Sequence, residues 1–227
     1  MLFRSGCRMN KIEFINVRKS YGHRDVIKGV SFSIKEKEIV SIIGPSGSGK
    51  STLLNMLGML EVIDGGKILI DGQKLPKINS KRATQFRRNK INYLFQSFAL
   101  ISNETVEKNL LIAMNYVKSS KKEKERRIDE VLKKLGISGL KKMQCNTLSG
   151  GEQQRVALAR CILKPGDIVL ADEPTGSLDP KMSDTVFAML KDLRNSFGKT
   201  ILIVTHDMNL AAQTDRQLKL KTQIPLN

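Results

Sequence analysis

The chain contains a glycine-rich segment whose spacing is typical of phosphate binding. Residues 44–51 read Gly-Pro-Ser-Gly-Ser-Gly-Lys-Ser, which matches the P-loop pattern G-x-x-x-x-G-K-S/T. Glycines let the backbone wrap with its N–H groups toward phosphate oxygens, and the helix that follows favours an anion at its start. A chance match in a chain of this size is on the order of a 1% event. The residues predicted to hold the nucleotide are Gly44, Pro45, Ser46, Gly47, Ser48, Gly49, Lys50, Ser51 and Thr52.

Within this segment two side chains have separate expected roles. Lys50 is expected to reach the β- and γ-phosphates of a nucleotide, and the Ser51 hydroxyl is expected to bind Mg²⁺. The sequence therefore predicts ATP and Mg²⁺ as the ligands of the loop.

Two consecutive carboxylates end an apolar run elsewhere in the chain. Asp172 and Glu173 follow the segment Ile-Val-Leu-Ala at residues 168–171. Asp172 is expected to hold the Mg²⁺ shell, usually through water. Glu173 is then placed to polarise the attacking water as a general base. The alternative is that the two acids merely begin a turn before Pro174, but the P-loop favours the catalytic interpretation.

A second anion site is predicted at another helix start. Ser149, Gly150, Gly151 and Glu152 precede the apolar helix expected over residues 155–163. Exposed N–H groups and the helix dipole favour an anion there. The alternative is a simple helix cap.

Buried strands and covering helices must position these groups. Nearly continuous apolar runs predict strands buried on both faces of a parallel sheet; they are residues 39–43, 168–171 and 201–204. Short alternating runs separated by turns predict an antiparallel region; they are residues 12–14, 30–34 and 67–70.

Helical patterns lie between the predicted strands. Residues 52–60 continue from the P-loop, and residues 105–117 are a second candidate. In residues 121–135 apolar side chains recur at i, i+3, i+4 and i+7, with Gly136 as C-cap. The fold class is therefore α/β. We expect one domain over residues 11–227, with a helical insertion at about residues 97–154, preceded by a disordered extension at residues 1–10.

The motif at residues 148–155, Leu-Ser-Gly-Gly-Glu-Gln-Gln-Arg, resembles the LSGGQ-type signature of ATP-binding-cassette (ABC) proteins. Glu152 stands where the family usually has Gln. The resemblance implies that two cassettes pair head to tail, so that Ser149 of one contacts the γ-phosphate held by the P-loop of the other. It also implies a P-loop NTPase core with a mainly parallel sheet, an N-terminal antiparallel β subdomain and an inserted α-helical subdomain.

The other motifs of the family follow in order, so that the resemblance covers residues 12–220. Tyr21 resembles the aromatic residue that stacks on adenine. Gln96 resembles the Q-loop glutamine that joins the Mg²⁺ and water shell. Asp179 resembles the D-loop aspartate of the dimer interface, and His206 resembles the switch histidine at the γ-phosphate. Each residue also has a local alternative, as a turn aromatic or a hydrogen-bonding group at a strand end.

Residues 42–55 and 173–179 look most like a bacterial branch of lipoprotein-release, macrolide-efflux and bacteriocin-export ATPases, and residues 95–106 most resemble the bacteriocin-export subunits. This implies an ATP-hydrolysing motor subunit that forms a homodimer or pairs with another cassette. The implied partner is a separate transmembrane permease, which exports a peptide, a lipoprotein or a hydrophobic compound. The implied location is cytoplasmic, peripheral on the inner face of the cell membrane.

Charge and cysteine content agree with this setting. The formal net charge is +17, and residues 72–103 contain no acid. We hypothesise that this basic stretch faces the anionic inner leaflet or acidic segments of the permease. The three scattered cysteines form no disulfide or zinc pattern and favour a reducing compartment. No apolar run approaches the roughly 20 residues of a membrane span.

Another class of ABC protein is the alternative: a non-transport ATPase that acts on nucleic acid or ribosomes, or in cell-division signalling. The charge favours nucleic acid. However, the chain has one cassette, no coiled-coil or zinc insertion, and no interleaved aromatic and basic platform. Beyond Arg216 the chain lacks the glycine-bearing hairpin with which such cassettes commonly close, so we expect the last strands to be missing or rearranged.

Overall fold

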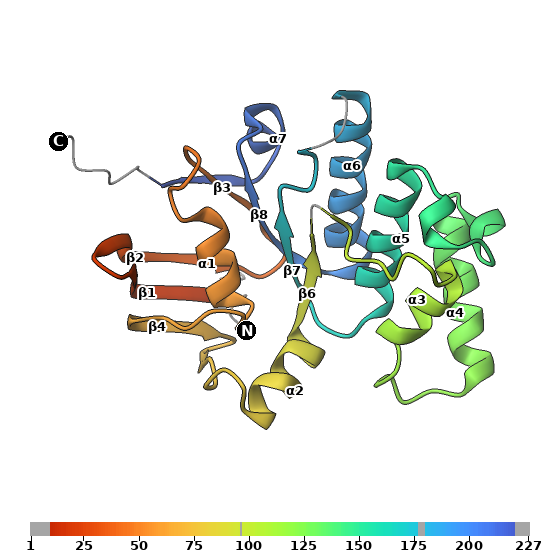
Figure 1. Ribbon diagram of the computed structural model, residues 1–227, viewed down its shortest axis with the longest axis horizontal. Helices are drawn as coiled ribbons and strands as arrows, with labels where there is room; N and C mark the ends of the chain where they lie inside the picture. The colour runs from red at the N-terminus through yellow and green to blue at the C-terminus, as the bar shows by residue number, and fades with distance from the viewer. Residues whose placement is uncertain (1–9, 96, 177–179, 221–227) are drawn as a thin grey trace, which may run out of the picture.

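The computed structural model describes residues 10–95, 97–176 and 180–220 (Figure 1). A five-stranded parallel sheet has the order β6-β7-β8-β3-β9. Its strands are β3 (Ile39–Ile43), β6 (Ile91–Leu94), β7 (Ile168–Asp172), β8 (Thr200–Thr205) and β9 (Arg216–Lys219). Every residue of β3 and β8 is buried, as expected for central strands covered on both faces. The three predicted parallel strands are confirmed.

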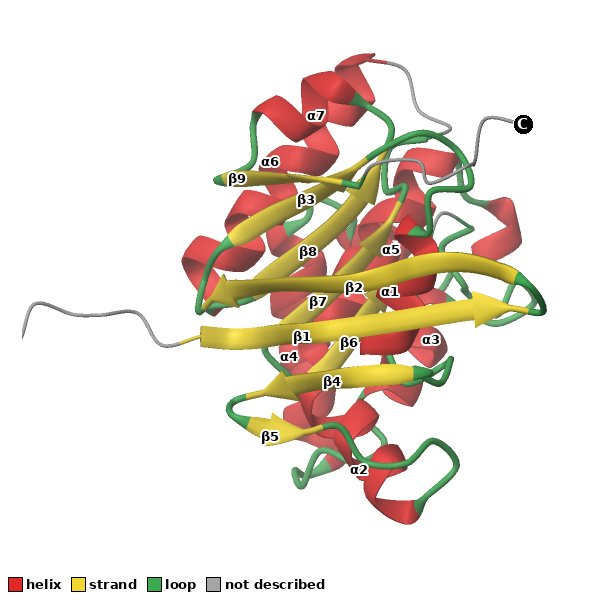
Figure 2. Ribbon diagram, turned by 90° about the vertical axis from the view of Figure 1, so that its left-hand side faces the viewer, coloured by secondary structure: helices red, strands yellow, loops and turns green. Residues whose placement is uncertain are grey.

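An antiparallel sheet of order β2-β1-β4-β5 lies in front of the parallel sheet in Figure 2. Its strands are β1 (Asn10–Tyr21), β2 (Arg24–Lys35), β4 (Gly65–Ile70) and β5 (Gln73–Lys74). The predicted antiparallel region is confirmed, but β1 and β2 are 12 residues each and extend well beyond the predicted segments. Their ends are rich in charged side chains, which hide the apolar alternation while the ladder hydrogen bonds continue.

Helix α1 (Lys50–Leu57) lies between the two sheets. Leu53, Leu54 and Leu57 are fully buried in one core with apolar residues of both sheets. The helix begins two residues before the predicted segment, because Gly49 serves as its N-cap in a left-handed conformation. This core fixes the P-loop, which leads directly into α1.

The opposite face of the parallel sheet is covered by α5 (Gly150–Leu163) and α6 (Pro180–Phe197). Helices α3 (Val106–Ala113) and α4 (Lys121–Lys134) pack on α5 around a separate apolar core. Short 3₁₀ turns, Ser138–Leu140 and Cys145–Thr147, connect α4 to α5. The predicted helices are present, while the helical insertion as a distinct subdomain stays a prediction.

Six of the described α-helices and β-strands were not predicted from the sequence, and β5, β6 and α6 are three of them. Helix α2 (Lys81–Lys90) was not predicted, because only Ala83 is buried and most of its residues are basic or polar. Strand β9 pairs in parallel with β3, so at least one strand beyond Asp215 is present; residues 221–227 lie outside the described part of the chain. A short helix, α7 (Met208–Ala212), precedes β9.

No helix within the described ranges combines the length and apolar character required to span a bilayer.

Candidate functional site

The P-loop connects the C-terminal end of β3 to the first turn of α1. Gly47 and Gly49 have φ angles of 74° and 89°, in the region that favours glycine. A Cβ atom on Gly49 would lie 2.6 Å from Ile27 Cδ1 and 2.9 Å from Val26 Cγ1. Because β2 packs this closely, no larger residue fits at Gly49. The loop is therefore held in one shape by the antiparallel sheet.

Lys50 is buried and folds back on the loop that precedes it. Its Nζ donates hydrogen bonds to the carbonyl oxygens of Gly44, at 2.8 Å, and Pro45, at 3.0 Å. Across the described residues, no carboxylate forms an ion pair with it. Its positive charge thus stays available to an anion at the loop, as the predicted contact with phosphates requires.

Ser51 and Asp172 meet at the C-terminal edge of the parallel sheet. The Ser51 hydroxyl donates to Asp172 Oδ1 at 3.1 Å, although the residues lie 121 positions apart. Burial raises the pKa of Asp172, and the charge of Glu173 raises it further, while Ser51 and Lys50 oppose the shift. A cation beside Asp172 would relieve both effects.

The Ser51–Asp172 pair fits magnesium. Mg²⁺ binds oxygen ligands, and in nucleotide sites it uses one or two protein groups plus phosphates and waters. A hydroxyl and one carboxylate supply this set. A cluster of three or more acidic, His or Cys ligands is absent from the portion of the chain that the structure describes, and such a cluster is not needed here.

Glu173 follows Asp172 with an unusual backbone conformation. Its φ of 45° is costly for a residue with a side chain and is typical of functional sites. Its Oε2 accepts from Thr205 Oγ1 at 3.0 Å and from the His206 backbone N–H at 3.3 Å, and it lies 3.0 Å from His206 Nδ1. Among the described residues all these contacts fall on Oε2, so Oε1 is free to act on a water molecule. The structure thus brings Glu173 and His206 together.

Lys50, Ser51 and Glu173 border one cleft of about 440 Å³, and Asp172 and His206 are not among the residues that line it. Besides residues of the P-loop and Glu173, its walls include Tyr21, Arg24 and Val26. Tyr21 is 49% exposed and stands at the end of β1, as the prediction of a base-stacking residue requires. Sequence reasoning did not identify Arg24, because a single arginine after a turn carries no recognisable motif.

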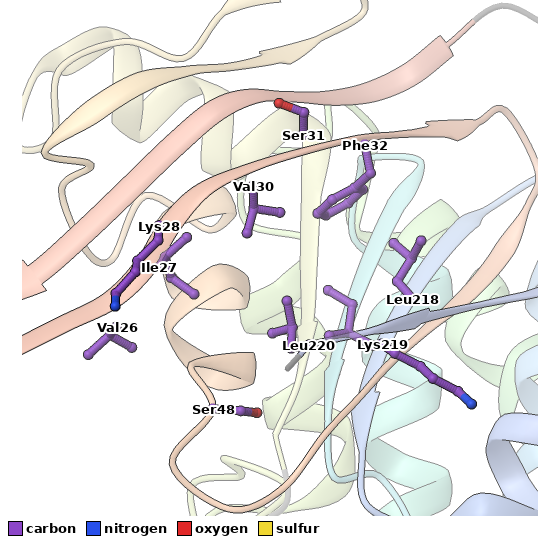
Figure 3. Close-up of a pocket in the computed structure, with 11 residues that line it drawn as sticks. Val26, Ile27, Lys28, Val30, Ser31, Phe32, Ser48, Leu218, Lys219 and Leu220 are labelled. Atoms are coloured by element: carbon purple, nitrogen blue, oxygen red, sulfur yellow. The ribbon is translucent and has the colours of Figure 1, made fainter. Parts of the chain in front are cut away.

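The Ser48 side chain does not line this cleft. It lines a second cavity of about 360 Å³ between β2 and β9, together with Val30, Phe32 and Leu218 (Figure 3). The Ser48 hydroxyl is buried and has no hydrogen-bond partner among the described residues. The Ser48 backbone N–H donates to the carbonyl oxygen of Pro45 at 3.2 Å, within the loop itself.

Ser149 forms the N-cap of α5 in a capping box with Glu152. The Ser149 hydroxyl lies 2.7 Å from Glu152 Oε2, which also accepts the Ser149 backbone N–H at 2.8 Å. Hydrogen bonds from the Ser149 side chain and backbone N–H lower the pKa of Glu152. The helix start is thus pre-formed, and a Cβ on Gly150 would meet no atom within 4 Å. The Gly150 side of the helix start is open, which leaves room beside the cap for the predicted anion.

We expect Ser149→Ala to lower the thermal midpoint of the nucleotide-free protein by about 2–4 °C, because losing an N-cap costs about 1 kcal/mol. Thermal denaturation followed by circular dichroism measures this. Ser138→Ala is the matched control, since Ser138 begins a 3₁₀ turn without a side-chain cap at its start and should leave the midpoint unchanged. Equal midpoints for both variants would contradict the capping interpretation.

Ser149 and the P-loop do not meet within one chain. Helix α1 packs on one face of the parallel sheet and α5 on the other. The predicted residues Gln96 and Asp179 lie outside the described residues. The roles assigned to all these side chains remain predictions, which the geometry of the cleft supports.

Comparison with known proteins finds a matching family and related proteins that agree with one another. The family described as ABC transporter matches residues 27–176. The lipoprotein-releasing system ATP-binding protein LolD of Porphyromonas gingivalis is 40% identical over 210 residues, which are 92% of this chain and 96% of that protein. The macrolide export ATP-binding/permease protein MacB of Mannheimia succiniciproducens is 40% identical over 217 residues, or 94% of this chain. The chain spans only 34% of that relative's length.

Solved structures agree in fold. The dimeric structure of the bacterial ABC transporter cassette MJ0796 has a TM-score of 0.83 and 40% identity, covering 93% of this chain and 94% of that one. A dimeric post-hydrolysis state of the same cassette, bound to ADP and Pi, has a TM-score of 0.82 and 38% identity, covering 94% and 97%. The predicted P-loop NTPase fold and ATPase class are confirmed. The chain belongs to the ABC transporter family and is an ATP-binding-cassette ATPase.

Proposed function

We propose that this chain is the motor subunit of an exporter. It binds a separate permease at the inner face of the cell membrane and closes as a dimer over Mg-ATP. The observation that carries the proposal is the Ser51–Asp172 pair beside Glu173, at the edge of a cleft lined by the P-loop. This arrangement supplies a metal position, a base and a phosphate cradle within one site.

Each side chain has one task in this proposal. Lys50 and the loop N–H groups bind the phosphates, while Ser51 and Asp172 hold Mg²⁺. Mg²⁺, when bound, neutralises charge on the phosphate oxygens. Glu173 accepts a proton from the attacking water. His206, whose imidazole is 70% exposed and lies 3.0 Å from Glu173 Oε2, is proposed to contact the γ-phosphate.

The second half of the site is proposed to come from another copy of the chain. Ser149, Gly150 and Gly151 form an open helix start on the far face of the sheet from the P-loop. In a head-to-tail pair, this helix start would face the phosphates bound by the partner. ATP would then favour the closed pair, because it contacts both chains only in that state.

The relatives indicate a class of cargo. One is named for lipoprotein release and another for macrolide export, which supports export of a lipoprotein, a peptide such as a bacteriocin, or another hydrophobic compound. In this proposal the permease chooses the cargo.

Basic side chains on α2 support contact with the membrane or permease. Arg87 donates to the Met59 carbonyl at 3.1 Å, and the Arg88 guanidinium lies 3.2 Å from the Tyr116 ring centroid. These two arginines therefore have structural roles. Lys81 and Arg82, in the first turn of α2, are exposed and are better placed to contact an anionic surface.

Charge reversal at Lys81 and Arg82, to Glu at both positions, is expected to weaken binding to vesicles of phosphatidylglycerol and phosphatidylethanolamine at least about tenfold, since each basic residue contributes roughly 1 kcal/mol. Vesicle sedimentation at low salt measures this. The double variant Lys118→Glu and Lys122→Glu makes the same charge change at exposed positions near α4. Equal weakening of vesicle binding by both double variants would show that only net charge matters. It would contradict the proposal that Lys81 and Arg82 contact the membrane.

The motor role itself is tested by purification from membranes. A tagged chain, isolated in detergent from its native host, is expected to bring down an integral membrane protein and to hydrolyse ATP in that complex. Recovery with ribosomes or nucleic acid, and without a membrane protein, would contradict the proposal.

A further inference from the structure

We infer that Glu61 is a positioning residue that fixes the Tyr21 ring at the mouth of the cleft, and so determines how much the base contributes to nucleotide affinity. The inference rests on the proposed function and on the predicted stacking of Tyr21 on the base. Glu61 belongs to none of the motifs of the cleft, and it lies 40 residues from Tyr21 in the sequence.

The Tyr21 ring needs an anchor, because nearly half of its surface is exposed at the end of β1. The structure supplies one: the Tyr21 hydroxyl donates a hydrogen bond to Glu61 Oε1. Glu61 lies in the segment between α1 and β4, and its side chain is only 19% exposed. A largely buried carboxylate thus holds an exposed aromatic ring in one orientation.

Lys19 secures the carboxylate and covers the ring. Its Nζ lies 3.6 Å from Glu61 Oε1 and 3.2 Å from Asp64 Oδ1. The same ammonium stands over the Tyr21 ring, 5.2 Å from the centroid. Because a cation occupies one face of the ring, the other face is left for a flat partner. A purine base is such a partner, and Tyr21 lines the nucleotide cleft.

The ionisation of the phenol agrees with this hydrogen bond. Burial, and then the hydrogen bond to Glu61, raise the pKa of Tyr21, while Thr52 and Lys19 oppose the shift. The phenol therefore has its proton at neutral pH, as any tyrosine does, and remains a donor.

Helix α1 connects the two ends of the nucleotide site. Its first turn carries Lys50 and Ser51, and the chain beyond its end carries Glu61. One rigid helix, packed between both sheets, therefore positions the phosphate-binding groups and the anchor of the base-binding ring. A nucleoside triphosphate contacts both ends of the site, whereas inorganic triphosphate contacts only the phosphate-binding end.

This difference defines the experiment. The dissociation constants of ATP and inorganic tripolyphosphate, each with Mg²⁺, are measured by calorimetry for the full chain and its Glu61→Ala, Glu61→Gln and Tyr21→Phe variants. Base–aromatic stacking contributes enough for Glu61→Ala and Tyr21→Phe to weaken ATP about 3- to 10-fold. Tripolyphosphate affinity should be unchanged. Glu61→Gln, whose amide oxygen still accepts the Tyr21 hydroxyl, should retain ATP affinity within about twofold.

The double variant Glu61→Ala, Tyr21→Phe provides the coupling test, because both changes remove the same hydrogen bond and should be no worse together than alone. The inference is overturned if Glu61→Ala leaves ATP affinity unchanged, or if it weakens ATP and tripolyphosphate equally, as general damage to the fold would. Failure of the proposed function looks different: the unmodified chain would then bind neither ligand.

Discussion

Replacing Glu173 by Gln is expected to slow ATP hydrolysis by a factor of about 10²–10⁴, the range typical of a lost general base, while ATP remains bound in a dimer. The amide has nearly the size of the carboxylate and its oxygen can still accept from Thr205 and the His206 backbone N–H, which contact Glu173 now. The amide oxygen is far too weak a base to take a proton from water. The site therefore keeps its shape but loses its general base.

Two measurements test this result. Light scattering with size-exclusion chromatography in Mg-ATP should show a dimer for Glu173→Gln, and extraction of the dimer peak should yield ATP rather than ADP. Glu130→Gln, on the exposed face of α4, removes one carboxylate far from the cleft and should retain the parent rate. A Glu173→Gln chain that stays monomeric, or hydrolyses ATP at the parent rate, would refute the role assigned to Glu173.

Asp172→Asn is expected to lower Mg-dependent hydrolysis about 10²-fold or more, because the metal position contributes several kcal/mol of charge stabilisation.

The Asp172→Asn change should also raise the thermal midpoint of the nucleotide-free protein. Burial, and then the charge of Glu173, raise the pKa of Asp172 above its usual value, so the ionised group opposes folding. When the pKa of an acid is higher in the folded state than in the unfolded state, its ionisation lowers the stability of the fold. This loss of stability begins as the pH rises through the unfolded-state pKa and is complete above the folded-state pKa. Asn removes it.

Differential scanning fluorimetry from pH 5 to 8 measures this effect with and without Mg-ATP. Mg-ATP should stabilise the parent chain, since a ligand of the folded state raises the midpoint, and should stabilise Asp172→Asn much less. Glu36→Gln, at an exposed acid in the turn after β2, is the control for removing a charge. A nucleotide-free Asp172→Asn protein that melts below the parent would contradict the argument from burial.

Local patterns in the sequence were sufficient to predict the centre of the fold. The P-loop, the apolar strand before Asp172 and the amphipathic helix α4 each fit within a short window, where backbone geometry and side-chain period are linked directly. The contact between Ser51 and Asp172 was expected, because both residues were predicted to hold Mg²⁺. The comparisons then confirmed the family and the branch with lipoprotein-release and macrolide-export relatives.

Other features depend on contacts between distant segments and have no local pattern. Helix α2 lacks an apolar stripe; its C-terminal carbonyls at Arg87 and Arg88 are satisfied by Lys164 from the end of α5. Strand β9 is recognisable only beside β3. The Glu61 anchor and the left-handed backbone of Glu173 likewise depend on tertiary structure. Gln96 and Asp179 stay predictions, because they fall outside the described residues.

The placement of α1 and α5 on opposite faces of the parallel sheet has a genetic consequence in the proposed dimer. A chain damaged at Lys50 and a chain damaged at Ser149 are each inactive when paired with themselves. When the two are paired with each other, one site receives an intact P-loop from one chain and an intact helix start from the other, while its counterpart carries both defects. Two inactive alleles of this gene should therefore complement each other.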